Sequence, residues 1–320
     1  MRSLLRSVCA FYYLLIPLSC GWVYAAGAGP QGVQELAGGR EVHDYAALQR
    51  RSVELFNQYD ASVVRVRATG VEYNPAAQGA KETVRVGTGF FISTEGHVLT
   101  TATVAQGARS VWVEHRGRPY AARVLGADAR TNIALLKVYE LPELFVAIPL
   151  VPIAKKPEVG SMVWSLSCPL DLNPTPALGL FCAAEGNFGP RMFPTYYWRV
   201  DVASGPGEGG APVLDLQGRL MGVVVAAVPE IRSSYILPVE AISRIRDELL
   251  FDGQVDYGYM GLEVEEKPDL IRGRRIFVSQ VIHGGPAEDA GVQVGDELLR
   301  IGDYPINSLA DVRSASFFVR

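Results

Sequence analysis

The sequence predicts a mostly β protein with a large β domain, a connecting helix and a small α+β domain. Between residues 84 and 238, short runs of β-branched and aromatic residues alternate with Gly, Pro and Asp turns, a pattern typical of a barrel pair or a sandwich. Residues 239–253 have helical apolar spacing, and residues 257–320 mix strand-like and helical runs. The 320 residues, 48% of them hydrophobic, suffice for more than one core, since domains usually hold about 100 to 200 residues.

The first 25 residues have the features of a secretory signal peptide. Basic residues precede an apolar run over residues 8–18, and a small-x-small pattern ends at Ala25, as signal peptidase requires. We expect export and cleavage there, with an uncleaved membrane anchor or lipidation at Cys20 as alternatives. Residues 26–42, rich in Gly and Ala, indicate a flexible lead.

Local patterns predict two helices and a hairpin in the β domain. Residues 43–59 have apolar residues at helical spacing and precede a strand, so we expect a helix that caps this domain. Residues 214–225, LDLQGRLMGVVV, place two apolar runs around a Gly-containing turn, which predicts a hairpin. In the later helix Gly253 is placed to end the element, and one side carries Ile242, Ile245, Leu249 and Leu250.

Charge and histidine spacing exclude several classes of ligand. The formal net charge is −4, from 30 basic and 34 acidic residues, so no single-signed field favours nucleic acid or a specific membrane lipid as a partner. The histidines are scattered without a cysteine or second histidine at metal-ligand spacing. We therefore expect neither a metal nor another cofactor.

The cysteines leave two possibilities for the exported chain. Cys9 and Cys20 lie in the signal segment, which leaves Cys168 and Cys182 for an oxidising compartment. Either they form one disulfide, or each is a free cysteine buried like a small apolar residue. The sequence leaves both open because it does not fix the separation of their Cα atoms.

Several segments of the β domain resemble the HtrA family of serine proteases. GTGFFISTEGHVLTTATVAQGA is similar to the family segment that carries the catalytic histidine, and GADARTNIALLKV is similar to the one that carries the aspartate. SLSCPLDL, ALGLFCAA, DVASGPGEGGAPVLDLQGRLMGVV and SSYILPVE follow in the family's order. The resemblance implies a trypsin-like double β-barrel over residues 43–238, then a linker helix over residues 239–256.

The last segment resembles a PDZ domain. GYMGLEV and HGGPAEDAGVQVGDELLRIGDYPI are similar to the carboxylate-binding loop and the core of that domain, over residues 257–320. The resemblance implies that a peptide adds as an extra strand beside the domain's own edge strand. The chain stops at Arg320, before the strand with which the family normally continues, so a truncated chain, a swapped strand and a reduced domain are all open. The implied peptide-binding residues are Tyr259, Met260, Gly261, Leu262, Glu263 and Val264.

All three catalytic positions of the family are replaced in this sequence. Thr103 stands where the family has histidine, Asn132 where it has aspartate, and Gly209 where it has serine. A hydroxyl at the first position cannot act as a general base near neutral pH. In trypsin-like enzymes the loss of the aspartate alone costs about 10⁴ in rate, and in a related triad the loss of serine or histidine costs about 10⁶. These replacements predict a pseudoprotease.

The turn around the missing serine carries further changes. In the family, backbone amides of this turn form the oxyanion hole. Gly207 belongs to it, and Glu208 replaces the usual asparagine, so its carboxylate either lies beside the hole, where it disfavours negative charge, or points to solvent. Ser204, on the approach to the turn, and His97, in the preceding strand, are the substitutes considered for nucleophile and base, and neither occupies a matched position.

Three functions follow from these expectations. The first is a catalytically silent periplasmic or envelope protein that binds peptides or unfolded proteins, with self-association as a trimer or an active HtrA paralogue as further partners. The second is an active HtrA-type endopeptidase in envelope protein quality control with a non-standard catalytic arrangement. The third is a structural scaffold that binds no peptide.

Overall fold

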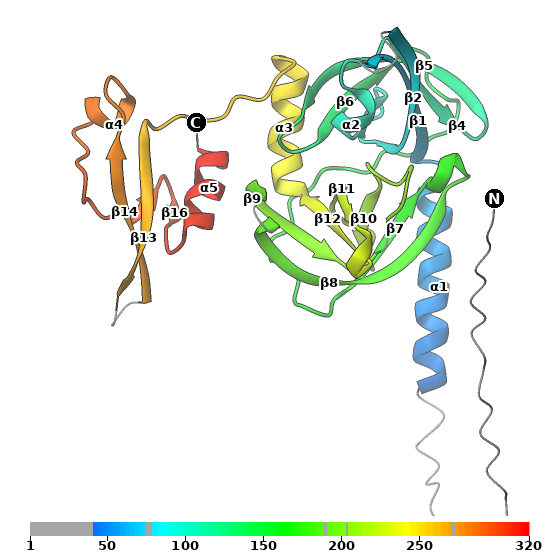
Figure 1. Cartoon of the computed structure of the whole chain (residues 1–320). Helices are drawn as coiled ribbons and strands as arrows, with labels where there is room; N and C mark the ends of the chain where they lie inside the picture. The colour runs from blue at the N-terminus through cyan, green and yellow to red at the C-terminus, as the bar shows by residue number, and fades with distance from the viewer. Residues whose placement is uncertain (1–40, 75–78, 189–190, 203, 270–272, 320) are drawn as a thin grey trace, which may run out of the picture. The chain divides into compact units, whose positions relative to one another are not determined.

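A computed structural model describes residues 41–319 apart from 75–78, 189–190, 203 and 270–272. The expected signal peptide, and with it Cys9 and Cys20, lies outside the described residues, as does nearly all of the expected flexible lead. The mostly β fold class is confirmed, with two closed barrels followed by a small α+β domain (Figure 1).

The first barrel has six antiparallel strands in the order β1-β2-β3-β6-β5-β4. Its interior is apolar, because Val66, Phe91, Val98, Val113 and Leu136 alternate inward along the strands and are buried. A short helix, α2 (Ala102–Ala105), follows β3. The strands are β1 (Val63–Asn74), β2 (Gly79–Phe91), β3 (His97–Thr100), β4 (Ser110–His115), β5 (Arg118–Asp128) and β6 (Ile133–Val138).

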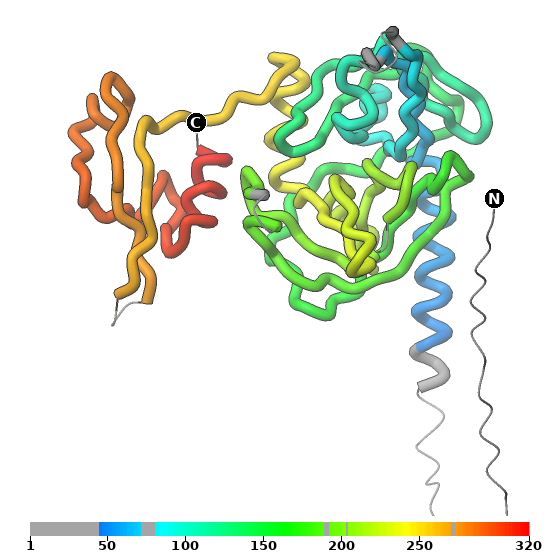
Figure 2. The backbone as a smooth tube through the Cα atoms, in the orientation of Figure 1, coloured from blue at the N-terminus to red at the C-terminus, as the bar shows by residue number. Residues whose placement is uncertain are grey.

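The second barrel repeats this architecture in the order β10-β11-β12-β9-β8-β7, and its closed path is followed in green and yellow-green in Figure 2. The predicted hairpin is β10 paired with β11. A 3-10 turn, η1 (Pro169–Asp171), leads from β7 to β8, and a second, η2 (Pro229–Ile231), precedes β12. The strands are β7 (Met162–Ser167), β8 (Thr175–Phe188), β9 (Arg191–Val200), β10 (Pro212–Asp215), β11 (Leu220–Val228) and β12 (Ser233–Pro238).

The helix α1 (Glu41–Tyr59) packs on the β10–β11 turn, as expected of a capping helix. The Tyr59 hydroxyl donates to the carbonyl of Gly218 at 2.8 Å, and Leu55 is fully buried. Gly218 has φ +85°, and a Cβ there would lie 3.2 Å from both Leu55 and Tyr59. The turn therefore requires glycine both for its backbone conformation and for the approach of the helix. Val53 is exposed and does not join this contact.

The helix α3 (Val239–Phe251) belongs to the core of the double barrel rather than acting only as a linker. Ile242, Ile245 and Leu249 are buried in the same apolar cluster as Trp164 of β7. Leu250, expected on that face, is exposed instead. The helix ends before Gly253, which has φ +73°, as predicted from its sequence position.

The small domain contains two short sheets and two helices. Its core is formed by Ile276, Ile301, Ile306, Val312 and Ala315. The elements are β13 (Leu262–Asp269), β14 (Gly273–Val281), α4 (Pro286–Asp289), β15 (Arg300–Ile301), β16 (Tyr304–Pro305) and α5 (Leu309–Phe318).

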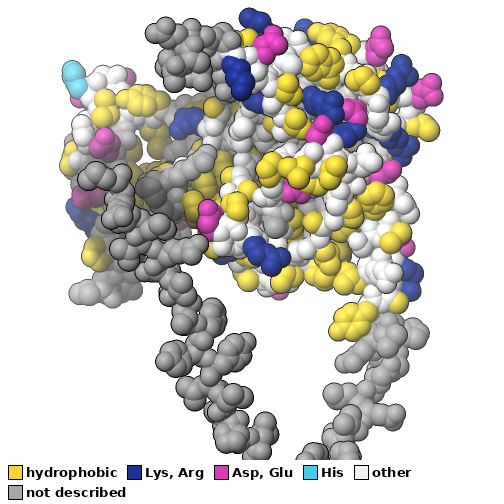
Figure 3. Space-filling model, turned by 45° about the vertical axis from the view of Figure 1, so that its right-hand side comes forward, with side chains coloured by type: hydrophobic (Ala, Val, Ile, Leu, Met, Phe, Trp, Pro, Cys, Tyr) yellow, Lys and Arg dark blue, Asp and Glu magenta, His cyan; other side chains and the backbone are white. Residues whose placement is uncertain are grey.

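No helix in the described ranges is long and apolar enough to span a bilayer. On the face drawn in Figure 3, basic and acidic side chains are interspersed and do not gather by sign.

Candidate functional site

The three residues that the sequence predicts at the catalytic positions, Thr103, Asn132 and Gly209, meet in one cavity of about 240 Å³ between the barrels. Thr103 comes from α2, Asn132 from the turn between β5 and β6, and Gly209 from the turn before β10. The structure thus brings together residues that are far apart in the sequence. The other lining residues are Val86, Thr101, Val104, Ser204, Gly205, Gly207, Val224, Val225, Ala226 and Ala227.

Thr103 and Asn132 are joined by two hydrogen bonds. The backbone N–H and the hydroxyl of Thr103 both donate to Oδ1 of Asn132, each at 2.8 Å. Nδ2 of Asn132 donates to the carbonyl of Val225 at 2.8 Å. The amide group is thereby satisfied on both sides, which fixes its orientation. The contact between Thr103 and Asn132 is a neutral one.

The turn that presents Asn132 is shaped by a carboxylate. Asp128 accepts from the backbone N–H of Thr131 at 3.0 Å, from that of Arg130 at 3.2 Å and from the Thr131 hydroxyl at 2.5 Å. Asn132 has φ +62°, a left-handed conformation that Asn and Asp adopt more readily than most residues. An aspartate is therefore compatible with this backbone.

The turn before β10 needs glycine at two positions but not at Gly209. Gly207 has φ +89° and Gly210 has φ +93°, and a Cβ on Gly210 would lie 2.1 Å from the carbonyl oxygen of Thr88. A Cβ on Gly209 would meet only Thr101, at 3.4 Å or more. A side chain therefore fits at Gly209.

The Glu208 side chain turns back onto its own turn. Its carboxylate accepts hydrogen bonds from the backbone N–H of Gly205 and from the Ser167 hydroxyl, the latter at 2.6 Å. Glu208 does not line the cavity. It therefore neither extends into solvent nor enters the cavity; it stabilises the turn.

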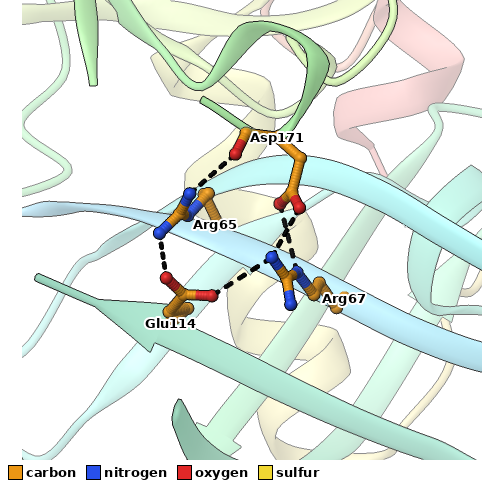
Figure 4. Close-up of polar contacts among 4 residues, drawn as sticks. All are labelled: Arg65, Arg67, Glu114 and Asp171. Carbon is orange, nitrogen blue, oxygen red and sulfur yellow. Dashed lines mark hydrogen bonds and ion pairs between the residues drawn. The ribbon is translucent and has the colours of Figure 1, made fainter. Parts of the chain in front are cut away.

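A charge cluster holds η1 against this turn (Figure 4). The guanidinium of Arg67 donates to both carboxylate oxygens of Asp171, at 3.1 and 2.5 Å, and that of Arg65 donates to the Asp171 carbonyl at 2.6 Å. Glu114 of β4 bridges the two arginines. Leu170 in turn donates its N–H to the carbonyl of Pro206 at 2.8 Å. The first barrel thus positions the turn of the second.

Two residues of this loop have a positive φ, which explains why a restraining cluster is needed. Leu170 has φ +47° and Asp171 has φ +66°, conformations that cost about 1–3 kcal/mol for residues other than glycine. Such a conformation persists only where its surroundings impose it. The three-residue cluster of Arg65, Arg67 and Glu114 supplies that restraint.

Neither substitute considered from the sequence forms a catalytic pair. The Ser204 hydroxyl lines the cavity but lies 2.7 Å from the Ser234 hydroxyl. His97 lies outside the cavity, where Nδ1 is 2.8 Å from the Ser93 hydroxyl, and burial lowers its pKa. His115 and His283 do not line it either, and the side chain of His43 lies outside the described residues.

The two cysteines of the double barrel are free thiols. Cys168 is fully buried, and burial raises its pKa to about 12. Cys182 is half-buried. The disulfide that the sequence left open is therefore not present, and only Cys168 fits the alternative of a buried apolar residue. Across the described part of the chain, no group of His, Cys, Asp and Glu side chains is arranged to hold a metal ion.

The small domain has its own, mainly apolar cavity of about 320 Å³. Of the residues expected there, Tyr259, Met260 and Leu262 line it. Gly261 forms the turn with φ +70°, and a Cβ on it would lie 3.0 Å from Pro286. Within the described residues β13 pairs only with β14. The residues that sequence reasoning did not single out are Gly258, Pro286, Ala287, Val292, Ile301, Ser316 and Val319.

The remaining two expected peptide-binding residues lie outside this cavity. Glu263 is exposed, and Val264 packs against the core of the small domain. A bulge between them shifts the register of the β13–β14 pair. Four of the additional lining residues, Pro286, Ala287, Ile301 and Ser316, come from α4, β15 and α5, whose approach to the loop cannot be predicted from local patterns.

Sequence comparison identifies both parts of the chain. Residues 87–223 match the family of trypsin-like peptidase domains, and residues 249–319 match the PDZ domain family. A probable periplasmic serine endoprotease, DegP-like, from Ectopseudomonas mendocina is 30% identical over 253 residues, which cover 75% of this chain and 52% of that protein. A protein of the same description from Chlamydia trachomatis is 28% identical over 243 residues, covering 72% and 48%. The chain thus spans about half the length of these relatives.

Solved structures agree in fold. The HtrA-type protease AlgW with a decapeptide has a TM-score of 0.68 at 22% identity, covering 84% of this chain and 91% of that one. The serine endoprotease from Yersinia pestis has a TM-score of 0.60 at 24% identity, covering 84% and 89%. With both domain families matched in this order and a DegP-like relative 30% identical over 75% of the chain, the chain belongs to the HtrA family.

Proposed function

We propose that this chain is a pseudoprotease of the HtrA family that binds polypeptide segments without cleaving them. The observation that carries the proposal is the neutral Thr103–Asn132 pair in the cavity, where both Thr103 donors are directed at one amide oxygen. Acyl transfer needs a base that takes a proton from the nucleophile. Here the group at the base position already donates its proton elsewhere, and the nucleophile position is Gly209.

The cavity also lacks groups that could replace this chemistry. Its lining contains aliphatic side chains, glycines, two threonines, one serine and one asparagine, with no imidazole, thiol or carboxylate. No group there titrates near neutral pH, as general base catalysis requires. Ser204 is the sole serine of the lining, and its hydroxyl contacts Ser234 rather than a base.

Binding is supported by both cavities. The cleft between the barrels offers a cavity of about 240 Å³. In the small domain, an apolar cavity lies at the start of β13, whose second edge has no described neighbour. Main-chain pairing along a free edge, combined with pockets for side chains, is how extended peptides add to a sheet. The ligands that fit are peptides and unfolded proteins with apolar residues.

We further propose that the chain works in the periplasm or envelope after cleavage of residues 1–25. The relatives carry the description periplasmic, and the N-terminal pattern is that of a signal peptide. An active HtrA paralogue or further copies of the chain, as in a trimer, are the protein partners proposed.

Restoring the triad tests the loss of catalysis. The variant Gly209→Ser, Thr103→His, Asn132→Asp is compared with the wild type and with a matched variant that lacks only Gly209→Ser. Degradation of a reduced, unfolded protein is followed by gel electrophoresis. We expect cleavage by the full restoration alone, because a serine fits at Gly209 and an aspartate suits the φ of Asn132. Cleavage by the wild type that Ser204→Ala abolishes would instead establish an active enzyme with a non-standard arrangement.

A second experiment tests peptide binding by the small domain. Met260→Glu introduces a charge into the apolar cavity, and Val294→Glu serves as the control because it adds the same charge at an exposed residue of the small domain outside the cavity. Fluorescence anisotropy with a peptide ending in an apolar residue should show saturable binding that the first variant weakens at least tenfold and the second does not. Absence of saturable binding to the wild type would favour a structural scaffold.

A further inference from the structure

Arg65 and Glu114 of the charge cluster in Figure 4 also line a separate cavity of about 430 Å³, called the hairpin cavity because the β4–β5 hairpin contributes Glu114 and Arg116 to it. It shares no lining residue with the two cavities described above. Asn173 and Pro174, between η1 and β8, line it from the second barrel. Its volume lies within the range of small-ligand pockets, about 300–1,000 Å³. A ligand seated there would contact both barrels at once.

The charged groups of this lining cancel in two ion pairs. Arg65 pairs with Glu114, and Arg116 pairs with Asp60 at 2.9 Å. Among the described residues, no other charged side chain lines the cavity. A ligand with a net charge would place that charge beside groups that are already neutralised, and an uncompensated charge away from water is costly. The lining therefore favours a neutral ligand.

The same lining keeps donors and acceptors that no described residue uses. Oδ1 of Asp60 accepts no hydrogen bond within the described residues, and Nε and Nη1 of Arg116 donate none to them. The printed contact of Asn173 is through its backbone carbonyl, which accepts from the Thr175 hydroxyl at 3.0 Å, so its side-chain amide remains available. Hydroxyl groups match such a mixture, because each one both donates and accepts.

Part of the lining is apolar. Phe56 of α1, Val63 of β1 and Pro174 supply it. Small-ligand sites combine such apolar surface with a few placed polar groups. A sugar ring has the matching distribution, since its C–H groups lie on its faces and its hydroxyls lie around its rim.

Arg116 occupies a turn position that disfavours arginine. Arg116 and Gly117 form the two-residue turn between β4 and β5, with φ +48° and +81°. Two-residue turns with positive φ at both positions prefer Asn, Asp or Gly at the first, and strained residues cluster at functional sites. The hairpin therefore does not account for the arginine, whereas the contact of its guanidinium with Asp60 at the cavity does.

We propose that the hairpin cavity binds a neutral saccharide of one or two rings. The ring rests on Phe56 and Pro174, and its hydroxyls bind the free atoms of Asp60, Arg116 and Asn173. This site lies outside the cleft, so it goes beyond the proposed peptide binding and does not depend on it.

Occupancy of the hairpin cavity should affect the turn before β10. Asn173 follows Asp171 by two residues, and the adjacent Leu170 donates its N–H to the Pro206 carbonyl at 2.8 Å. A saccharide that bridges the hairpin and Asn173 restrains this loop relative to the first barrel, as the ion pairs of Figure 4 do. Binding should therefore slow hydrogen exchange at residues 205–211.

Calorimetric titration with sugars of matched size tests the ligand class. The neutral probes are glucose, galactose, N-acetylglucosamine, maltose and lactose. We expect saturable binding of at least one of them, at least tenfold tighter than that of the uronate and the amino sugar of the same ring, which add a negative and a positive charge. Glycylglycine, a zwitterion, should also bind at least tenfold more weakly, because its charges would need partners that are already in ion pairs. Equal or tighter binding of a charged probe or of glycylglycine, or no saturable binding of any neutral sugar, would overturn the proposal.

Two variants place the sugar in the cavity. Arg116→Gly removes the guanidinium but suits the turn, so it should weaken the bound sugar at least tenfold without lowering the urea midpoint. Asp60→Asn removes the charge of an acceptor and should weaken the sugar about threefold, since hydrogen bonds to charged groups are about twice as strong as neutral ones. Unchanged affinity in Arg116→Gly would contradict the proposed site.

A matched control makes the same change outside the cavity. Asp247→Asn breaks the exposed ion pair with Arg246 on α3, at 2.6 Å, and neither residue lines the hairpin cavity. It should leave the affinity for the sugar as in the wild type. A loss equal to that of Asp60→Asn would show that the effect is not specific to the cavity and would count against the site.

Hydrogen exchange separates binding from its effect on the turn. A saturating concentration of the sugar should slow exchange at residues 205–211 at least threefold in the wild type. Arg67→Gln should keep the affinity within threefold, because Arg67 does not line the cavity, but it should lose the slowing, because its bond to Asp171 is broken. Slowing that persists in this variant, or no slowing in the saturated wild type, would overturn the route through Asp171. Neither measurement requires a peptide, so failure here leaves the proposed function to its own tests.

Discussion

The guanidinium of Arg67, on β1 of the first barrel, donates hydrogen bonds to both carboxylate oxygens of Asp171 in the second barrel, at 3.1 and 2.5 Å. This contact ties the strained η1 loop to the turn before β10, through the hydrogen bond from the N–H of Leu170 to the carbonyl of Pro206. The Arg67–Asp171 ion pair therefore helps to shape the cavity between the barrels, although neither residue lines that cavity.

Arg67→Gln should loosen that turn. We expect a loss of about 1 kcal/mol in unfolding free energy, because the pair is partly exposed. Hydrogen exchange at residues 205–211 should accelerate severalfold, since η1 no longer fixes the Pro206 carbonyl. The control is Arg116→Gln, which breaks the Arg116–Asp60 pair on the surface. The same acceleration in this control would show that the effect is not specific to the cluster.

Gly210→Ala should be strongly destabilising. Its φ is +93°, and the added Cβ would lie 2.1 Å from the Thr88 carbonyl, so we expect a loss of about 2–4 kcal/mol. Gly209→Ala is the matched control, because its Cβ meets nothing closer than 3.4 Å, and it should change stability by less than about 1 kcal/mol. Urea unfolding of both variants measures the difference, and similar values would contradict the described turn.

The two thiols should differ in reactivity. In a chain that begins at Ala26, one thiol should react with a chromogenic disulfide reagent in the native state, because Cys182 is half-buried. Cys168 should react only after unfolding, since burial raises its pKa to about 12 and excludes the reagent. Cys182→Ser should remove the native signal. Native labelling of Cys168 would argue against the packing around β7.

Stability should fall as the pH is lowered from about 7 to 5. Burial lowers the pKa of His115, whose ring lies 3.0 Å from the Ala61 carbonyl, with Arg116 acting in the same direction and Asp60 against it. The folded protein thus holds a neutral imidazole, whereas the unfolded chain takes up a proton near pH 6.5. His115→Gln should flatten the pH dependence of urea midpoints. His283→Gln, at an exposed site, should leave it as in the wild type.

Much of the fold was predictable because the strands, turns and helix ends depend on residues that are close together in the sequence. The alternation of apolar residues predicted the strands, Gly218 marked the β10–β11 turn, and Gly253 marked the end of α3. Leu250 shows the limit of this reasoning, because helical spacing alone does not decide which edge of an apolar face meets the core. The orientation of Glu208 could not be predicted for a similar reason, since it depends on Ser167, which is distant in sequence.

The sequence by itself determined the identity of the side chains at the three positions predicted as catalytic, and with it the chemistry that Thr103, Asn132 and Gly209 can offer. Only the tertiary structure decided how they meet: that Thr103 donates to Asn132, that Gly209 has room for a side chain, and that Arg67 holds Asp171. Residue type fixes which protons and charges are available. The closing of two barrels against each other fixes which groups lie within hydrogen-bonding distance, because those contacts join strands that no local pattern relates.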